Sequence, residues 1–341
     1  MISRRDFIKT SAITGTGIAL STSLFAQINS NNGLRIGMIG LDTSHCIAFT
    51  KTLNDSAAGE SFDGYKVVAA YPHGSLDIKS SVDRIEGYTD QMKTMGIEIV
   101  DSIDTLLKKV DVVILDTNDG RRHLEQALPV LKAGKRMFID KPMAASLSDA
   151  IILFNAAQHF NVPVFSSSSL RYIEGMDDIK NGALGKVLGV EAFSPAPLEK
   201  THPDLFWYGI HGVEILFTAM GTGCKTVVRT FTPNADFVVG TWEDSRIGTF
   251  RGIRSGEGEY GGTIFGEKGV RNLAGYNGNN RLLKEITTYF KTGIIPVQPE
   301  ETLEILAFME AADESKKRGG VPVSVEKIMK HARTESKKYK F

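Results

Sequence analysis

The sequence is poor in cysteine and has no excess of either charge. Its two cysteines, Cys46 and Cys224, are too few for a disulfide framework and lack the spacing of a zinc site. Lysine plus arginine and aspartate plus glutamate both number 40, so nothing in the charge balance points to a nucleic-acid or acidic-membrane partner. Internal repeats and low-complexity segments are also lacking. The 42% of hydrophobic residues is typical of a folded globular protein, and 341 residues suffice for two domains.

The N-terminal segment differs from the rest of the chain. Arg4 and Arg5 form a twin-arginine pair, and a moderately apolar stretch rich in Gly, Ser and Thr follows up to Ala26. This stretch is too short and too polar for a stable membrane span, but it is typical of a twin-arginine export signal. We therefore predict a signal peptide at residues 1–26, the twin-arginine export machinery as a partner, and a periplasmic or otherwise exported protein. An amphipathic helix with a fortuitous arginine pair is the alternative.

Residues 34–168 alternate between apolar runs and helical patterns. The apolar runs typical of buried strands cover residues 34–40, 65–71, 97–100, 111–116, 136–140 and 162–165. A helical pattern with one apolar face covers residues 123–133 and ends at Gly134. Apolar strands separated by helices predict a doubly wound parallel sheet with helices on both faces, whose ligands bind at the carboxyl ends of the strands.

Residues 169–325 have a different pattern. Helices are expected at residues 176–181, 205–220 and 299–318, and strands at 227–232, 236–241, 247–253 and 260–265. Gly261-Gly262 and Asn277-Gly278 are turn signals. The segment therefore predicts a second, α+β domain with a largely antiparallel sheet. Residues 326–341 are expected to be a C-terminal tail.

Several short motifs then occur in a familiar order. They are Asp116-Thr117-Asn118, His123, Ala133-Gly134-Lys135, Asp140-Lys141-Pro142, Gly182-Ala183-Leu184-Gly185-Lys186-Val187 and Gly209-x-His211-x-x-Glu214. Together they resemble the signature of the glucose–fructose oxidoreductase/inositol dehydrogenase family (Gfo/Idh/MocA), across nearly all of residues 34–325. The resemblance implies a Rossmann domain that binds NAD or NADP and redox chemistry on a small-molecule sugar or polyol. It also implies a second domain whose sheet helps to form a homodimer or homotetramer.

The predicted phosphate loop departs from the family pattern. Asp42 and His45 stand at the second and third glycine positions of the dinucleotide fingerprint that begins at Gly40. The Asp42 carboxylate would repel a phosphate unless it points away or caps the following helix, and His45 could compensate as a cation. The choice between NAD and NADP stays open. The residues expected to contact the cofactor are Gly40, Asp42, Thr43, Ser44, His45, Thr117, Asn118, His123, Asp140 and Lys141.

Two residues are candidates for the chemistry itself. Oxidising an alcohol needs a base for the hydroxyl proton and a cation to polarise the developing carbonyl, and the resemblance gives these roles to His211 and Lys141. If residues 205–220 form one helix, Trp207, His211 and Glu214 share a face on which Glu214 could orient His211 and Trp207 could stack on a sugar. Further candidates for substrate contact are Arg171, Tyr172 and Tyr208.

A metal site is the weaker interpretation of another group of residues. The loops after the parallel strands carry Asp42, His45, His73, Asp116 and His123, which can approach one another. His and Asp together can ligate zinc or manganese. Their spacing matches no known metal motif, and such residues more often cap helices or line a polar cleft, so we predict no metal site.

The sequence thus predicts an exported enzyme that oxidises or reduces a hydroxyl of a sugar, polyol or glycoside, with His211 as base and Lys141 as polarising cation. We expect NAD or NADP to be tightly bound, because free nicotinamide cofactors are scarce outside the cytoplasm. One alternative is a glycoside hydrolase or lyase that oxidises its sugar transiently with a retained NAD. The other is a non-catalytic carbohydrate-binding protein on a degenerate fold, suggested by the two lost glycines and by Trp207.

Overall fold

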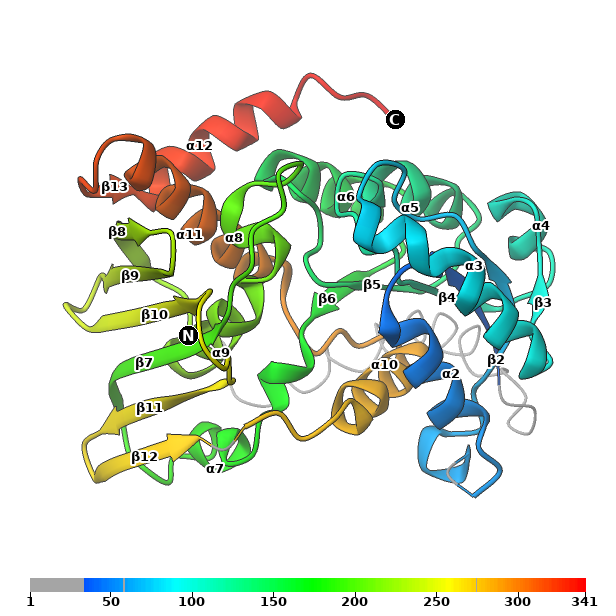
Figure 1. Ribbon diagram of the computed structural model, residues 1–341, viewed down its shortest axis with the longest axis horizontal. Helices are drawn as coiled ribbons and strands as arrows, with labels where there is room; N and C mark the ends of the chain where they lie inside the picture. Colours follow the sequence, from blue (N-terminus) through cyan, green and yellow to red (C-terminus); the bar gives the residue numbers. More distant parts are fainter. Residues whose placement is uncertain (1–33, 58, 274) are drawn as a thin grey trace, which may run out of the picture. The chain divides into compact units, whose positions relative to one another are not determined.

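The computed structural model describes residues 34–57, 59–273 and 275–341 of the chain. The predicted signal peptide at residues 1–26 lies outside the described residues. Leu34 to Phe341 form one compact unit that contains two β-sheets. Figure 1 shows both sheets with their helices.

The first sheet has six parallel strands in the order β3-β2-β1-β4-β5-β6. The strands are β1 (Arg35–Ile39), β2 (Lys66–Tyr71), β3 (Glu98–Ile99), β4 (Val112–Leu115), β5 (Met137–Asp140) and β6 (Val164–Ser167). All six correspond to the apolar runs of the sequence, so the predicted doubly wound sheet is confirmed. The strand order reverses between β1 and β4, and folds of this kind bind their ligands in the crevice at that point.

Alternate side chains of the central strands enter two different cores. Val113 and Leu115 of β4 pack with α5 (His123–Lys132) and α6 (Leu147–His159), while the intervening residues of β4 pack with helices on the opposite face. A strand that is buried on both faces needs apolar residues in succession, which explains the continuous runs. Burial of each large side chain contributes about 1.5–3 kcal/mol.

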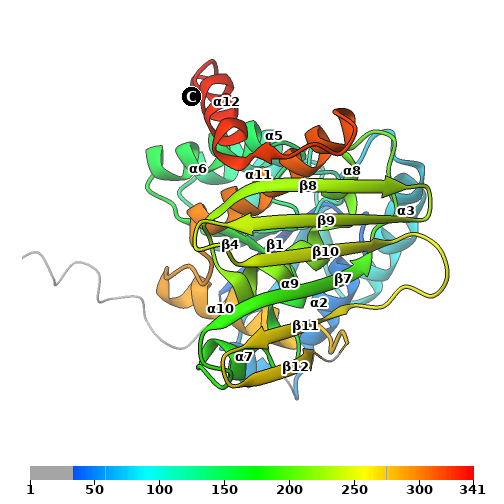
Figure 2. The ribbon, with the colours of Figure 1, turned by 90° about the vertical axis from the view of Figure 1, so that its left-hand side faces the viewer.

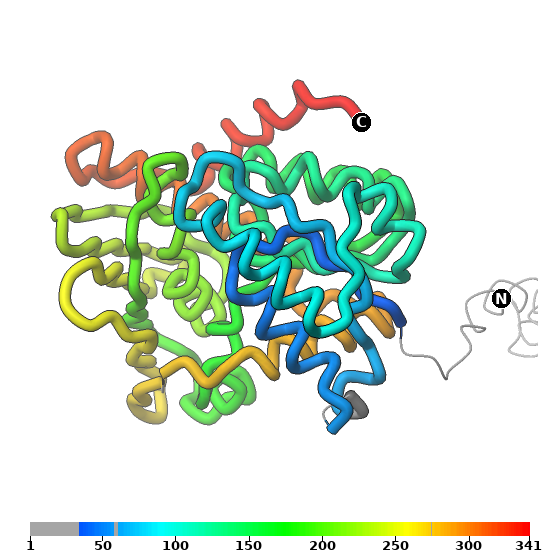
Figure 3. The backbone as a smooth tube through the Cα atoms, turned by 45° about the vertical axis from the view of Figure 1, so that its right-hand side comes forward, coloured from blue at the N-terminus to red at the C-terminus, as the bar shows by residue number. Residues whose placement is uncertain are grey.

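Two helices that are far apart in the sequence cover the opposite face of the parallel sheet. They are α2 (Ser44–Asn54), which directly follows β1, and α10 (Asn280–Thr292), whose apolar side chains pack in the same core as those of α2. Figures 1 and 3 both show α10, in orange, beside α2, in blue. The sequence analysis did not predict α10. The remaining helices near this sheet are α3 (Lys79–Thr94), α4 (Ile103–Leu107) and the short 3-10 turns Gly59–Phe62 and Ser169–Tyr172.

The second sheet has seven strands in the order β12-β11-β7-β10-β9-β8-β13. They are β7 (Val187–Pro195), β8 (Cys224–Thr232), β9 (Ala235–Trp242), β10 (Ile247–Ile253), β11 (Gly261–Gly266), β12 (Gly269–Leu273) and β13 (Val323–Ser324). Strands β7 and β10 pair in parallel, and the other described neighbours pair antiparallel. The predicted, largely antiparallel sheet is therefore confirmed, although β7, β12 and β13 were not predicted.

Helices cover one face of this second sheet. They are α9 (Ile210–Met220) and α11 (Pro299–Lys317), and α7 (Met176–Lys180) lies nearby. Figure 2 looks onto the opposite face, in front of which no helix is drawn. None of the described helices is both long and apolar enough to cross a membrane.

The single helix predicted over residues 205–220 is wrong. The chain forms α8 (Asp204–Trp207), breaks at Tyr208 and Gly209, and continues as α9. A Cβ at Gly209 would lie 3.1 Å from the carbonyl oxygen of Leu205, so the backbone at the break passes close to Leu205. The break removes Trp207 from the helix face that carries His211 and Glu214.

The C-terminal residues and the two cysteines also have defined positions. Most of the segment expected as a tail forms α12 (Val325–Ser336), which packs on α6 and α11. Cys46 and Cys224 are both buried and unpaired, in two different cores.

Candidate functional site

The loop after β1 begins with a glycine that no other residue could replace without strain. Gly40 has a φ of +89°, and a Cβ at this position would lie 2.4 Å from the Thr117 Oγ1 atom. The loops after β1 and β4 therefore touch at the switch point of the sheet. Thr43 caps α2, because its side chain accepts a hydrogen bond from the His45 N–H.

Asp42 joins three loops from a fully buried position. Its carboxylate accepts hydrogen bonds from the N–H and the Oγ of Ser75, both at 2.7 Å, and from the N–H of Asn118 at 2.9 Å. Gly74 makes room for it, since a Cβ there would lie 2.3 Å from Asp42 Oδ2. The sequence analysis expected Asp42 either to point away or to cap the following helix. In the structure it points away and does not cap α2.

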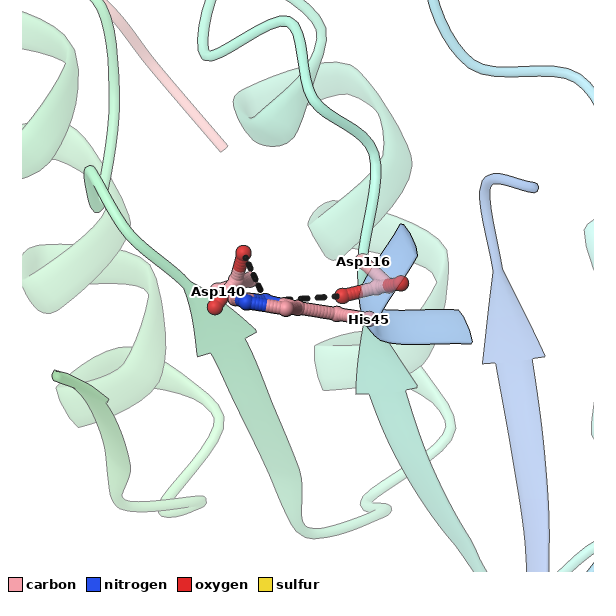
Figure 4. Close-up of side chains that lie close together, drawn as sticks. All are labelled: His45, Asp116 and Asp140. Carbon is pink, nitrogen blue, oxygen red and sulfur yellow. Dashed lines mark hydrogen bonds and ion pairs between the residues drawn. The ribbon is translucent and has the colours of Figure 1, made fainter. Parts of the chain in front are cut away.

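His45 lies between two buried carboxylates, as Figure 4 shows. Its Nδ1 atom is 3.1 Å from Asp140 Oδ2, at the end of β5, and 4.0 Å from Asp116 Oδ1, just after β4. The ring also stacks on Phe49, with the ring centres 4.9 Å apart. Of the five residues weighed as metal ligands in the sequence, His45 and Asp116 are thus brought together, with Asp140 as their third neighbour.

The two carboxylates next to His45 have opposite pKa shifts. Burial, together with the charges of Asp140 and Asp42, raises the pKa of Asp116 well above its usual range, although the charge of Lys141 opposes the shift. Burial acts in the same direction on Asp140, but His45 and Lys141 outweigh it and hold the pKa of Asp140 below its usual range. Lys141 is itself buried, with Nζ 3.6 Å from Asp140 Oδ2.

A pocket of about 260 Å³ adjoins this cluster. Its lining includes Ser44 and His45 from the start of α2, His211 from α9, and the tyrosines Tyr208, Tyr260 and Tyr276. The hydroxyl groups of Tyr208 and Tyr260 are 2.8 Å apart and hydrogen bonded. The pocket therefore presents hydroxyl groups and imidazoles together.

His211 is held in place by a serine that the sequence analysis assigned to a turn. Ser168 Oγ lies 2.7 Å from His211 Nδ1, so this hydrogen bond fixes the ring. Burial, followed by the positive charges of Lys141 and His45, lowers the pKa of His211 well below 6.5. His211 is therefore neutral at neutral pH, as a general base must be.

Glu214 contacts an arginine rather than the catalytic candidate. Its Oε2 atom accepts a hydrogen bond from Arg171 Nε at 2.9 Å, and Arg171 Nη1 donates to Glu301 at 2.7 Å. Glu214 Oε1 also accepts from the Ser168 N–H at 3.3 Å. Glu214 thus supports His211 through Ser168, and Arg171 is buried in this ion-pair network instead of lining the pocket.

The other predicted site residues are spread over the loops around the sheet. Trp207 packs against His202, with ring centres 5.1 Å apart, and the Tyr172 side chain is buried. Thr117 donates its hydroxyl to Gln126, and Asn118 donates its side-chain amide to Ser81. The ring nitrogens of His123 lie 2.6 and 3.2 Å from the carbonyl oxygens of Thr117 and Met143, so His123 fastens the loops together.

Four residues of the site were missed from the sequence. Tyr260, Tyr276 and Asn279 line the pocket, and Ser168 orients His211. Tyr276 directly precedes Asn277-Gly278 in a loop, and Tyr260 directly precedes Gly261-Gly262. The turn predicted at Gly261-Gly262 is wrong, because both glycines belong to β11. A polar aromatic residue beside a glycine-containing loop was the available signal for Tyr276, since loops held by a rigid scaffold often carry binding residues.

The loop after β1 has only some of the features that bind a dinucleotide in a Rossmann fold. The tight turn at Gly40 and the N-terminus of α2 are in the expected place for a pyrophosphate. At the second glycine position Asp42 turns away to Ser75 and Asn118, and at the third His45 contacts Asp140. The structure therefore keeps the turn and the helix N-terminus that bind a pyrophosphate, but it has side chains at two positions where the fingerprint has glycines.

Comparisons with known proteins show what the chain is similar to. Residues 34–168 match the GFO_IDH_MocA model, described as an oxidoreductase family with an NAD-binding Rossmann fold. The description of that family agrees with the Rossmann domain, the oxidoreductase class and the nicotinamide cofactor predicted from the sequence.

Curated relatives match over less than half of their length. An inositol 2-dehydrogenase of Salmonella typhimurium is 27% identical over 149 residues, which are 41% of this chain and 44% of the relative. A glucose-6-phosphate 3-dehydrogenase of Bacillus subtilis is 28% identical over 104 residues, 29% of each chain.

Solved structures share the fold over most of the chain. A probable dehydrogenase from Thermotoga maritima has a TM-score of 0.70 at 19% identity, covering 86% of this chain and 100% of its own. A scyllo-inositol dehydrogenase from Lactobacillus casei, solved with NAD(H) and scyllo-inositol, has a TM-score of 0.67 at 16% identity, with 86% and 100% covered. These likenesses extend the agreement in fold to the second sheet.

Proposed function

We propose that the chain is an oxidoreductase that acts on a hydroxyl group of a sugar, polyol or glycoside. The observation that carries this proposal is a buried, neutral histidine, His211, in a pocket beside the carboxyl edge of the parallel sheet. The family match of residues 34–168 supports a redox reaction. A nicotinamide dinucleotide, when bound, accepts or supplies the hydride.

His211 is the proposed general base. When the proton of its neutral ring is on Nδ1 and is donated to Ser168 Oγ, Nε2 keeps the lone pair that a base needs. Its low pKa keeps this lone pair available at neutral pH. The base can then take the proton from a substrate hydroxyl in the pocket, and general-base catalysis of this kind contributes about 10²–10⁴-fold in rate.

Lys141 is the proposed polarising cation. Its ammonium group is buried beside Asp140 and acts electrostatically on His211, whose pKa it helps to lower. A buried cation at this place stabilises negative charge on a carbonyl oxygen that forms nearby. Lys141 and His211 therefore have complementary roles: one withdraws electrons and the other removes the proton.

The pocket favours a small ligand with many hydroxyl groups. Its volume of about 260 Å³ is below the range of about 300–1,000 Å³ typical of sites for drug-sized ligands. Tyrosine, serine and asparagine side chains offer donors and acceptors to several hydroxyls. Relatives named as inositol dehydrogenases make cyclic polyols the first substrates to examine.

The experiment is a substrate screen with matched variants. Purified chain is mixed with NAD⁺ or NADP⁺ and a panel of cyclic polyols and hexoses, and the reduced nicotinamide is followed by its absorbance. We expect His211→Gln to lower kcat by about 10²–10⁴-fold. His331→Gln removes an exposed histidine on α12 and should leave kcat unchanged. Turnover that persists in His211→Gln would refute the assigned base.

A non-catalytic carbohydrate-binding protein is the second candidate. It is favoured by the side chains of Asp42 and His45 in the phosphate loop, which oppose the usual seat of a dinucleotide. Saturable polyol binding without nucleotide, measured by calorimetry together with an absence of turnover, would support it.

Export and assembly complete the proposal. The Arg4-Arg5 pair supports export by the twin-arginine route to the periplasm with the cofactor already tightly bound; cell fractionation tests this.

Exposed apolar side chains on the outer face of the second sheet, namely Phe237, Ile247 and Phe265, support a homodimer or homotetramer formed through that face. Light scattering tests the assembly.

A further inference from the structure

Three buried carboxylate oxygens of the cluster around His45 have no hydrogen-bond partner among the described residues. They are both oxygens of Asp116, which is 0% exposed, and Oδ1 of Asp140. Buried charged groups are normally paired, hydrogen bonded or bound to metal. Asp42 is equally buried a short distance away, but three donors satisfy its carboxylate. Of these three neighbouring carboxylates, Asp116 and Asp140 have oxygens without a partner, while Asp42 does not.

The donor atoms around the gap are arranged as metal ligands are. One ligand atom from each of His45, Asp116 and Asp140 lies within 4.8 Å of the other two. An ion bonded at about 2.0–2.2 Å to each ligand holds its ligands at most about 4.4 Å apart. The distances of 3.1 and 4.0 Å from His45 Nδ1 fall within this span, and the two carboxylate ligand atoms are at most 4.8 Å apart.

We propose that His45, Asp116 and Asp140 bind one divalent cation. A histidine that binds a metal is neutral, so with His45 as a ligand the three buried carboxylates, including Asp42, face one nearby lysine, Lys141, and charge favours a cation here. The donor set of one imidazole and two carboxylates suits manganese or zinc better than magnesium or calcium, which prefer oxygen ligands alone. The ligands come from α2 and from the ends of β4 and β5, so the ion fastens three elements together (Figure 4).

The cation site differs from the sequence prediction of no metal and does not depend on the proposed redox function. His45 belongs both to the cluster and to the lining of the pocket with His211. A cation on Nδ1 therefore fixes the orientation of one wall of that pocket. The alternative occupant is a proton shared between the carboxylates, but one proton joins only two of the three unpartnered oxygens.

The test is a manganese titration of the full purified chain after treatment with a chelator. Free Mn²⁺ is followed by its electron paramagnetic resonance signal, without nucleotide or polyol, and Zn²⁺ is added as competitor. We expect one Mn²⁺ per chain, displaced by Zn²⁺. Asp116→Asn keeps the shape of the side chain and should weaken binding at least about tenfold. Asp104→Asn removes an exposed carboxylate on α4 and should bind as the parent does.

Three results would overturn the site: no stoichiometric binding by the chelated parent, unchanged affinity in Asp116→Asn, or an equal loss in Asp104→Asn. Circular dichroism checks that Asp116→Asn is folded, and His45→Gln, which removes the nitrogen ligand, must weaken binding as well. Because no nucleotide or polyol is present, a negative result leaves the proposed oxidoreductase function standing. A substrate screen without turnover leaves the metal site standing in the same way.

Discussion

Loss of the Glu214 charge should destabilise the protein strongly, because it leaves Arg171 buried with one partner fewer. Glu214 Oε2 lies 2.7 Å from Arg171 Nη2 and 2.9 Å from Arg171 Nε. The two side chains are only 4% and 5% exposed. Removing one partner of a buried pair costs about 3–5 kcal/mol. Glu301 still contacts Arg171, so we expect Glu214→Gln to lose about 3 kcal/mol, near the lower limit.

Urea denaturation followed by circular dichroism measures this loss, and the melting temperature should fall by about 4–5 °C. Glu301→Gln is the matched control: its side chain is 24% exposed, so the loss should stay below about 1 kcal/mol. The double variant Arg171→Met with Glu214→Leu removes both buried charges and should lose less than Glu214→Gln alone. A loss below about 1 kcal/mol in Glu214→Gln, or an equal loss in Glu301→Gln, would refute the reasoning.

Three further predictions follow from single contacts. Burial and two neighbouring cations lower the pKa of His211, so kcat/KM should keep its neutral-pH value as the pH falls through 6.5; an acid limb centred there would contradict the assignment. Gly74→Ala forces a Cβ against Asp42, so its free energy of unfolding in urea should fall by about 1–3 kcal/mol. Gly87→Ala, which has open space around it, should not be destabilised. Equal losses in the two variants would contradict the role of Asp42 in joining the loops. Burial, with a nearby glutamate, raises the pKa of Cys224 to about 12, so a thiol reagent should modify it only after unfolding, and rapid modification of native protein would be the contrary result.

The sequence predicted the parallel sheet well because that sheet is buried on both faces. Strands such as Val112–Leu115 must then be apolar throughout, and few other folds alternate continuous apolar runs with helical patterns. The break at Tyr208 and Gly209 was missed because the residues on either side of it suit a helix. The close approach of Gly209 to Leu205 is visible only in three dimensions.

The partners within the site were the harder part to predict. His45 pairs with Asp140, 95 residues away, and Asp42 bonds to residues 33 and 76 positions away. Periodicity and motifs indicate which edge of the sheet a residue occupies, but they do not indicate which way its side chain turns. For that reason the sequence correctly placed Asp42 and His45 close together after the first strand, although His45 belongs to α2 and not to the loop. It could not show that three donors satisfy Asp42 and that His45 lies between two carboxylates.

The claim that this fold carries a nicotinamide dinucleotide for redox chemistry is tested most directly by mass spectrometry of the small molecules that acid releases from the purified, folded chain. The proposed function predicts NAD or NADP at close to one molecule per chain, despite the side chains of Asp42 and His45 in the phosphate loop. An empty protein that also fails to bind added NAD(P)(H) in a fluorescence titration would contradict the proposal and favour a cofactor-free, sugar-binding role.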